Sequence, residues 1–253
     1  TGIKRLSLTD TITKIGNGAF NGCSNITDDF SSLGNVEEIG NYAFYNCKSM
    51  SGSTDFRSLK TIGVYAFYGC SGMSDNINLQ SLEKIGEYAF YGCSEITGTV
   101  TIPDAVTTIG NYTFYNCSKI EKLVIGDNVA SLGEGSFSGC TNITNLTMPI
   151  SLNVVANATP AFSNCSKIVA YTFTKGTGKG FDYSQTKGST YYQYTPWYYA
   201  KNSAIAVSIN EGAEKIGNNM FNDCTGLSMC DISSSVTTIG DYAFYGCKNT
   251  WGD

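Results

Sequence analysis

Cysteine is the residue of this chain with the greatest chemical potential, because a thiolate can act as a nucleophile, a metal ligand or a disulfide partner. The sequence holds ten Cys and no His. Histidine is the commonest general base and metal ligand, and the usual partner of a catalytic Ser or Cys. We therefore expect no catalytic centre, no metal site and no cofactor site that depends on an imidazole.

The spacing of the cysteines favours a structural role. Nine of them occupy one repeat position, 23 to 25 residues apart except for a gap of 59 between Cys165 and Cys224. Metal ligands must converge on a point, which a column of equivalent positions does not do. Side chains stacked in register point the same way, whereas disulfide partners face each other. We expect a column of free, buried thiols that pack as small hydrophobic residues, with disulfides and a metal site as less favoured alternatives.

The elements that position these thiols are repeats of about 23 residues. Each repeat reads Ile-Gly, three residues, Phe, two residues and Cys, as in Ile109-Gly110, Phe114 and Cys117. Between one Cys and the next Ile-Gly, apolar residues alternate with polar ones, which indicates a short strand with one buried face. The Gly suits either a bend with unusual backbone angles or close packing. A unit of this size cannot bury its own apolar side chains, so the pattern predicts stacked coils of short strands and turns with little helix.

The run from Ile109 to Cys117, IGNYTFYNC, resembles the BspA-like class of leucine-rich repeats, and the resemblance covers the chain apart from one interruption. Members of this class are surface proteins of anaerobic bacteria, treponemes and some parasitic protists. The resemblance implies a right-handed, curved leucine-rich-repeat solenoid that is secreted or displayed at the cell surface and adheres to host proteins or other cells. It implies no ligand, because the matching positions are core positions. A column of free thiols is compatible with secretion in an anaerobic habitat.

We predict a single repeat array over residues 1–253, with regular coils in 1–173, an irregular loop or coil in 174–200 and resumed coils in 201–253. Each end of the sequence interrupts a repeat, since the first three residues match those that follow Cys140. The sequence is therefore expected to be a segment of a longer array.

The irregular segment is rich in Gly and then in aromatic residues. The aromatic residues are Tyr183, Tyr191, Tyr192, Tyr194, Trp197, Tyr198 and Tyr199. Two interpretations stay open. Trp197 and some of the Tyr fill the core where a regular coil is missing, or the segment is an exposed loop that contacts a ligand.

Tyrosines flank the Phe of four consecutive repeats. Four lie two residues before the Phe and four lie one residue after it: Tyr42, Tyr65, Tyr88 and Tyr112, then Tyr45, Tyr68, Tyr91 and Tyr115. If the Phe points inward, we expect two outward stripes of rings. The rings either stack to stabilise the array or form an exposed aromatic patch that marks an interaction surface. These eight Tyr, with Trp197 and Tyr198, are the candidate binding residues.

The outward residues of the strands form a second candidate surface. They are polar, small and weakly charged, as at Thr99, Thr101, Lys122 and Thr147. Such a face in a solenoid commonly binds an extended partner. The alternative is an ordinary solvated sheet face.

Charge and hydropathy exclude two classes of partner. The net charge is −5 with only 16 Lys and Arg, so the basic footprint of a nucleic-acid binder is missing. No stretch approaches the roughly 18 to 20 apolar residues that span a bilayer, so we expect no membrane insertion by this segment.

The function predicted from the sequence is a non-catalytic binding module, secreted or on the cell surface, for a host or matrix protein or a surface glycan. One alternative is a structural spacer in a larger surface protein. A more remote one is a glycan-cleaving enzyme with two carboxyl groups roughly 5 to 9.5 Å apart.

Overall fold

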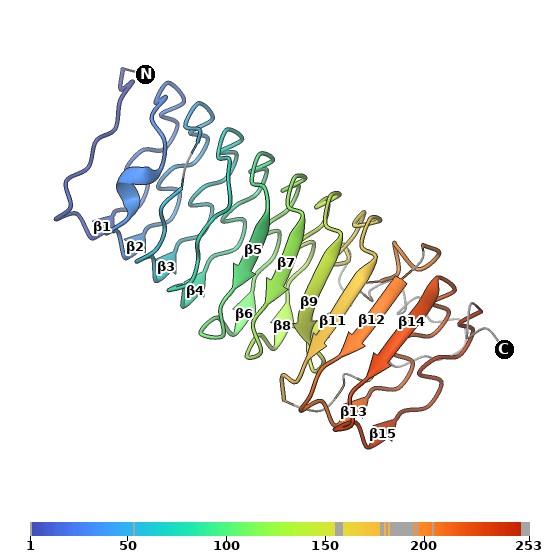
Figure 1. Ribbon diagram of the computed structural model, residues 1–253. Coiled ribbons are helices and arrows are strands. Elements are labelled where there is room, and N and C mark those ends of the chain that lie inside the picture. Colours follow the sequence, from blue (N-terminus) through green and yellow to red (C-terminus); the bar gives the residue numbers. More distant parts are fainter. Residues whose placement is uncertain are drawn as a thin grey trace.

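The chain winds into a stack of coils that runs from the N-terminal to the C-terminal end (Figure 1). The computed structural model describes residues 2–52, 54–154, 159–177, 180, 182, 195, 197–203 and 205–248. Within these residues the regular elements are short parallel strands and one 3-10 helix, η1 (Ser31–Leu33). The predicted solenoid of short strands and turns with little helix is confirmed.

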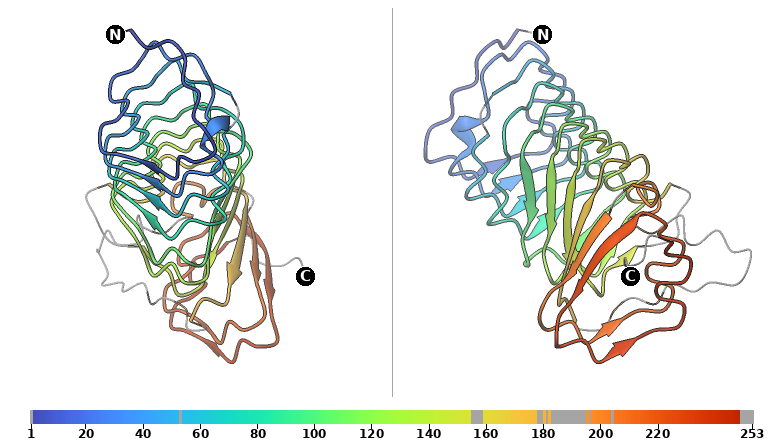
Figure 2. Two further views of the ribbon diagram at one scale, coloured as in Figure 1. Left: turned by 90° about the vertical axis from the view of Figure 1, so that its left-hand side faces the viewer. Right: turned by 45° about the vertical axis from the view of Figure 1, so that its right-hand side comes forward.

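Each regular coil has three sides. The coil that contains Phe114 begins with β5 (Thr99–Ile102) on the strand side, bends at β6 (Thr108–Ile109), and returns through turns from Gly110 to Cys117. We call this last part the return run. Seen along the stack, successive coils follow nearly the same outline over much of its length (Figure 2). Equivalent side chains of neighbouring coils therefore lie one above the other.

The strand sides of the later coils form a six-stranded parallel sheet in the order β14-β12-β11-β9-β7-β5. The further strands are β7 (Lys122–Ile125), β9 (Asn145–Pro149), β11 (Ala170–Thr174), β12 (Ile205–Ile209) and β14 (Leu227–Ile232). In the first coils the described strand side has isolated bridges in place of strands, such as Phe30 with Thr54. Phe30 and Phe56 are buried there and contact the ring of Phe67, so extra aromatic volume fills the core.

The bends form smaller parallel sheets. One contains β1 (Lys14–Ile15), β2 (Glu38–Ile39), β3 (Thr61–Ile62) and β4 (Lys84–Ile85); the others contain β6, β8 (Ser131–Leu132) and β10 (Asn153–Val154), and β13 (Lys215–Ile216) and β15 (Thr238–Ile239).

Close packing between bends explains the Gly after Ile in the coils that follow another regular bend, such as Gly63. A Cβ atom on Gly63 would lie 2.5 Å from the carbonyl carbon of Gly40, and the φ of Gly63 is not positive. Of the two explanations that the sequence allows for this Gly, the close approach of the preceding coil is the correct one.

The core is a column of aromatic rings, one from each return run. We number the coils 1 to 10 by these residues: Phe20, Phe44, Phe67, Phe90, Phe114, Phe137, Phe162, Trp197, Phe221 and Phe244. From Phe20 to Phe162 the ring centroids of neighbours are 5.1 to 5.5 Å apart and the rings are nearly parallel. Such offset stacks add to the stabilisation that comes from burial itself.

The predicted column of buried thiols is also confirmed. All ten Cys are free, and all but Cys23 and Cys230 are buried. In seven coils the thiol donates to the Phe carbonyl oxygen of the preceding coil at 3.0 to 3.2 Å; the donors are Cys47, Cys70, Cys93, Cys117, Cys140, Cys165 and Cys247. Cys is a compact apolar residue that can still donate a weak hydrogen bond, and this explains its recurrence.

Trp197 and Ala200 take the places of Phe and Cys in coil 8. The backbone N–H of Tyr198 donates to Thr195 at 3.1 Å, and that of Ala200 donates to Trp197 at 3.0 Å. The regular run from Tyr42 to Cys47 contains the same two bonds, at 3.2 and 3.1 Å. Thr195 and residues 197–200 thus belong to a return run without the sequence signature.

Gly180 and Asp182 take the place of the bend in coil 8. The N–H of Gly180 donates to the carbonyl of Lys215 at 3.0 Å, and the Asp182 carboxylate accepts the N–H of Asn218 at 2.8 Å. In coil 1, Asn17 accepts the N–H of Asn41 in the same way. Tyr183, Tyr191, Tyr192 and Tyr194, which the sequence also singled out, lie outside the described residues.

Candidate functional site

The eight flanking tyrosines form two parallel columns of stacked rings on the return runs of coils 2 to 5. Ring centroids are 4.6 to 5.1 Å apart along Tyr42, Tyr65, Tyr88 and Tyr112, and 4.6 to 4.9 Å apart along Tyr45, Tyr68, Tyr91 and Tyr115. The two rings of one coil contact each other at 5.5 to 6.0 Å. We call these eight residues the tyrosine ladder. The two stripes expected from the sequence are present.

The first column stands on a left-handed backbone. The φ angles of its four Tyr lie between 52° and 57°. In other coils the equivalent residues are Gly18, Gly135, Asn219 and Tyr242, with φ between 54° and 63°. Left-handed backbone costs a bulky L-residue roughly 1–2 kcal/mol, whereas Gly adopts it readily and Asn at lower cost. The backbone alone therefore does not select Tyr at this position.

The C-terminal end of the ladder is closed by coil 6. The ring of Tyr112 lies over Gly135, where a Cβ would be 2.7 Å from the ring. The Tyr112 hydroxyl donates to Glu134 Oε1 at 2.5 Å and lies 3.3 Å from the Thr159 hydroxyl. Coil 6 therefore has room for the last ring because it carries Gly at the Tyr position. Sequence reasoning missed both Glu134 and this role of Gly135.

The N-terminal end of the ladder is open. Coil 1 carries Gly18 and Asn21 at the two Tyr positions, and Tyr42 is 42% exposed while the other ladder residues are half-buried. One face of the Tyr42 ring is therefore without a ring neighbour in coil 1.

The hydroxyls of Tyr65, Tyr88 and Tyr112 stay protonated at neutral pH. Burial, followed by the neighbouring Tyr hydroxyls and Glu87, raises the pKa of Tyr65 and Tyr88 above the ordinary value. The hydrogen bond to Glu134 raises the pKa of Tyr112, and the same bond lowers the pKa of Glu134. These three Tyr thus present neutral hydroxyl groups that can donate and accept hydrogen bonds.

Trp197 and Tyr198 are not part of this surface. Trp197 is only 2% exposed and packs against Phe221, Phe173 and Tyr171, so its ring belongs to the core. Tyr198 is half-buried, with the Lys201 ammonium 4.6 Å from its ring centroid. Coils 6 and 7 separate Tyr198 from the ladder and carry small residues at the equivalent position, Ser138 and Ser163.

The six-stranded sheet carries two rows of outward residues. In register, one row is Thr99, Lys122, Asn145, Ala170, Ala206 and Met229, and the other is Thr101, Val124, Thr147, Thr172, Ser208 and Asp231. Every one of these side chains is at least partly exposed. The strand face therefore carries mostly small side chains. Lys122 lies near one end of it and Asp231 at the other.

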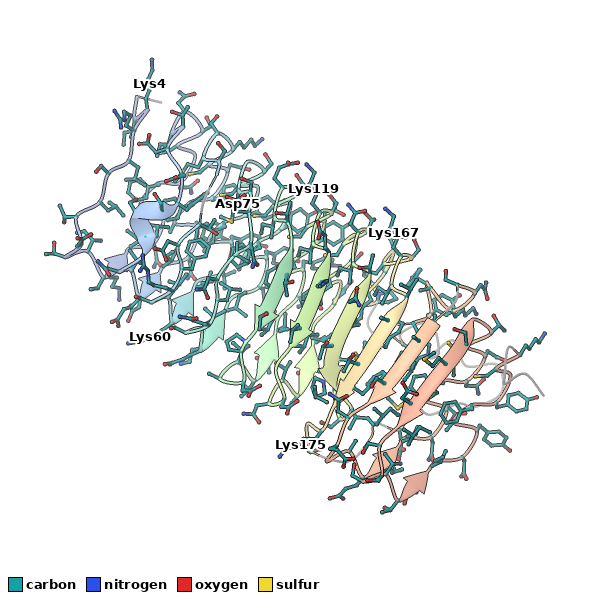
Figure 3. The ribbon with its side chains drawn as sticks, in the orientation of Figure 1. Lys4, Lys60, Asp75, Lys119, Lys167 and Lys175 are labelled. Atoms are coloured by element: carbon teal, nitrogen blue, oxygen red, sulfur yellow. The ribbon has the colours of Figure 1, made fainter. Side chains whose placement is uncertain are left out.

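Other charged side chains lie at the edges of the stack. Figure 3 shows Lys60 at the edge formed by the bends, and Lys119 and Lys167 at the opposite edge. The ammonium of Lys60 pairs with Glu37 at 2.8 Å, and that of Lys119 with Glu95 at 2.5 Å. In the part of the chain that the structure describes, no group of three His, Cys, Asp or Glu is placed to hold a metal ion. No helix among those residues is long and apolar enough to cross a bilayer.

Comparison with known proteins identifies the repeat. The profile of the BspA type leucine rich repeat region matches residues 1–97, 60–184 and 194–251, in six copies. The chain belongs to the BspA-type leucine-rich repeat family. The third match begins just before Thr195, in agreement with the return run that Trp197 forms. The solenoid is therefore a leucine-rich-repeat solenoid, as the resemblance implied.

The solved structures that are similar to this BspA-type chain include several leucine-rich repeat proteins. A leucine-rich repeat protein of Bacteroides ovatus has 20% identity over 98% of the chain and a TM-score of 0.48, and the chain spans 65% of that protein. A leucine rich cell surface protein of Faecalibacterium prausnitzii has 18% identity, with 98% of the chain and 86% of that protein covered and a TM-score of 0.48. The leucine rich repeat protein of T. pallidum has 15% identity, coverage of 97% and 77%, and a TM-score of 0.33. No curated protein matches the chain.

Proposed function

We propose that this chain is a non-catalytic binding module of a secreted or surface-displayed protein, and that it attaches to a host or matrix protein or to a glycan of another cell. The observation that carries the proposal is the tyrosine ladder. Coils 6 and 9 have the same left-handed backbone with Gly135 and Asn219 in place of Tyr. The fold therefore does not require Tyr there, yet four consecutive coils carry it.

The family supports the proposed location, which is secretion or display at the cell surface. BspA-type repeats resemble those of surface proteins, and a binding surface is useful outside the cell. The ladder also suits binding in its own right. Tyr offers a large contact area and a hydroxyl with little rotamer entropy to lose, and stacking orders the rings before a partner arrives.

The test is a binding survey with two matched variants. The chain is screened against arrays of extracellular matrix proteins and glycans, and the strongest partner is titrated. We expect Tyr65→Asn/Tyr88→Asn to weaken binding at least about tenfold, since adjacent anchors are removed. The matched control, Thr147→Ala/Thr172→Ala on the strand face, leaves the affinity unchanged. Loss of binding in the control alone would assign the partner to the strand face and refute the ladder.

A structural spacer is the competing function, and one observation favours it. The ladder rings cover one another at 4.6 to 5.1 Å, as expected if they only stabilise the stack. In that case no partner emerges from the survey, and the Tyr variants change only the free energy of unfolding.

A further inference from the structure

The two ends of the tyrosine ladder differ in what lies next to the terminal ring. At the C-terminal end, Tyr112 is closed off by Gly135 and by its hydrogen bond to Glu134. At the N-terminal end, Tyr42 has coil 1 beside it, where the equivalent residue is Gly18. The result is one ring of the first column with an accessible face, and this ring is the most exposed of the eight.

Tyr42 is held rigidly as a platform. Its ring is stacked on Tyr65 with centroids 4.9 Å apart and 9° between the planes, and it contacts Tyr45 at 5.7 Å and 53°. The rings behind Tyr65 continue the stack, so Tyr42 cannot rotate without leaving its neighbours. A platform that is ordered before binding lowers the entropic cost of capturing a ligand.

The surroundings of the platform are neutral and rich in amides. The return runs of coils 1 and 2, residues 16–23 and 40–47, contain no charged residue and four Asn: Asn17, Asn21, Asn41 and Asn46. The Oδ1 atom of Asn17 accepts the N–H of Asn41, and the Oδ1 atom of Asn41 accepts the N–H of Val64, both at 2.8 Å. These bonds fix the side chains and make their amide NH₂ groups the donors of this surface. Asn21 is exposed beside Gly18.

An ordered aromatic ring beside neutral amide groups favours one class of ligand. A cation would be favoured by a carboxylate and an anion by Lys or Arg, and the two return runs carry neither. A purely apolar group would leave the amides without partners. A pyranose ring has one face of C–H groups that can lie on an aromatic ring, and hydroxyl groups around its rim that pair with amides. Ligand sites commonly join such an apolar wall to a few oriented polar groups.

We infer that the open end of the ladder is a subsite for one neutral hexopyranose ring, stacked on Tyr42 and hydrogen-bonded by Asn21 and Asn41. The inference rests on the proposed binding function and names its ligand class. The sugar is an exposed residue of a glycan on another cell or matrix, and the hydroxyl rows of the ladder continue the contact toward Tyr112.

The experiment uses the chain and a panel of methyl hexopyranosides and their neutral oligosaccharides, measured by saturation-transfer NMR and by titration. One sugar residue on an open platform binds weakly, in the millimolar range, and a glycan that reaches along the ladder binds more tightly. Two variants test the platform. Tyr42→Asn removes the ring at a backbone position that Asn tolerates. Gly18→Tyr adds a further ring on left-handed backbone, as coils 2 to 5 do, and covers the open face.

We expect each variant to weaken sugar binding at least about tenfold, while the control Thr147→Ala, on the strand face, does not change it. Full affinity in the Gly18→Tyr variant overturns the inference. If the Gly18→Tyr variant fails to fold, the Tyr42→Asn variant tests the inference alone, and full sugar affinity in it overturns the inference. If no pyranose binds but a protein partner depends on Tyr65 and Tyr88, the inference fails and the proposed function stands. If neither sugar nor protein binds, both fail.

Discussion

The inward and the outward aromatic residues of the return runs differ in how regularly they recur from coil to coil. The aromatic column of the core is complete, with Phe or Trp197 in each of the ten coils, and a Cys or Ala200 follows it, buried in every coil but the first. The tyrosine ladder occupies only coils 2 to 5, a few residues away on the same turns. A feature present in every coil is one that stacking requires. The outward Tyr pair is not in every coil: beyond the ladder it recurs in coil 10 as Tyr242 and Tyr245, and coils 1, 6, 7, 8 and 9 lack it. Stacking therefore does not require the pair, and specificity can reside in it.

The buried thiols of the core should make the folded state unstable at high pH. Burial raises the pKa of Cys47, Cys165 and Cys224 to about 12, from the ordinary 9.0. The folded state then keeps protons that the unfolded state has lost, so stability is full below pH 9.0 and falls as the pH rises toward 12. Each buried thiol lowers the free energy of unfolding by about 1.4 kcal/mol per pH unit in this window. With eight buried thiols, we expect complete unfolding below pH 12, measured by circular dichroism.

A variant isolates the thiols from the other titrating groups. Cys70→Ala/Cys93→Ala is less stable at neutral pH, but its stability falls less steeply above pH 9.0 because two titrating groups are gone. Thiolate absorbance gives the second readout. Thiols that titrate near 9.0 while the protein is still folded would contradict the buried column.

Replacement of adjacent residues contrasts the two sides of one coil directly. Phe90 is fully buried and its neighbour Tyr91 is half-buried in the ladder. We expect Phe90→Ala to lower the free energy of unfolding by about 3–5 kcal/mol. Tyr91→Ala loses two stacking partners on the surface and should cost about 1–3 kcal/mol. Chemical denaturation of both variants measures the difference, and equal losses would show that the ladder is as structural as the core.

The sequence predicts what every coil shares and misses what single coils do differently. The Phe and Cys columns follow from the period, because each coil must bury the same positions. Coil 8 could be predicted only as an irregular loop or coil, with a core position as one interpretation of Trp197, because Trp197 and Ala200 replace the signature residues and Trp197 lies 35 residues after Phe162. The left-handed turn before each Cys can be predicted from the sequence, since Gly, Asn or Asp recurs there, as at Asn46 and Gly69. The left-handed turn at the ladder is not, because Tyr is a poor indicator of that conformation.

Packing between backbones gives a smaller effect that a matched pair of glycines can measure. A Cβ on Gly63 would lie 2.5 Å from backbone atoms of coil 2, whereas a Cβ on Gly16 would have nothing within 4 Å. We expect Gly63→Ala to cost about 1–3 kcal/mol, because the coils must move apart. Gly16→Ala should change the free energy of unfolding by less than about 0.5 kcal/mol. A neutral Gly63→Ala would mean that the stack is looser than its inter-coil contacts indicate.

The smallest expected change in the free energy of unfolding best distinguishes a binding role of the ladder from a stacking role. Tyr65 and Tyr68 have equivalent surroundings: each stacks on two rings, at 4.9 and 4.6 Å, but only Tyr65 has a left-handed φ. Asn at either position loses two ring contacts of about 0.5–1.5 kcal/mol each. At Tyr65, relief of roughly 1–2 kcal/mol of backbone strain offsets this loss. We therefore expect Tyr65→Asn to leave the free energy of unfolding within about 1 kcal/mol of the original and Tyr68→Asn to lower it by more. The reverse order would make Tyr65 a structural requirement and favour the spacer, whereas the expected order leaves recognition of a partner as the reason for Tyr at this position.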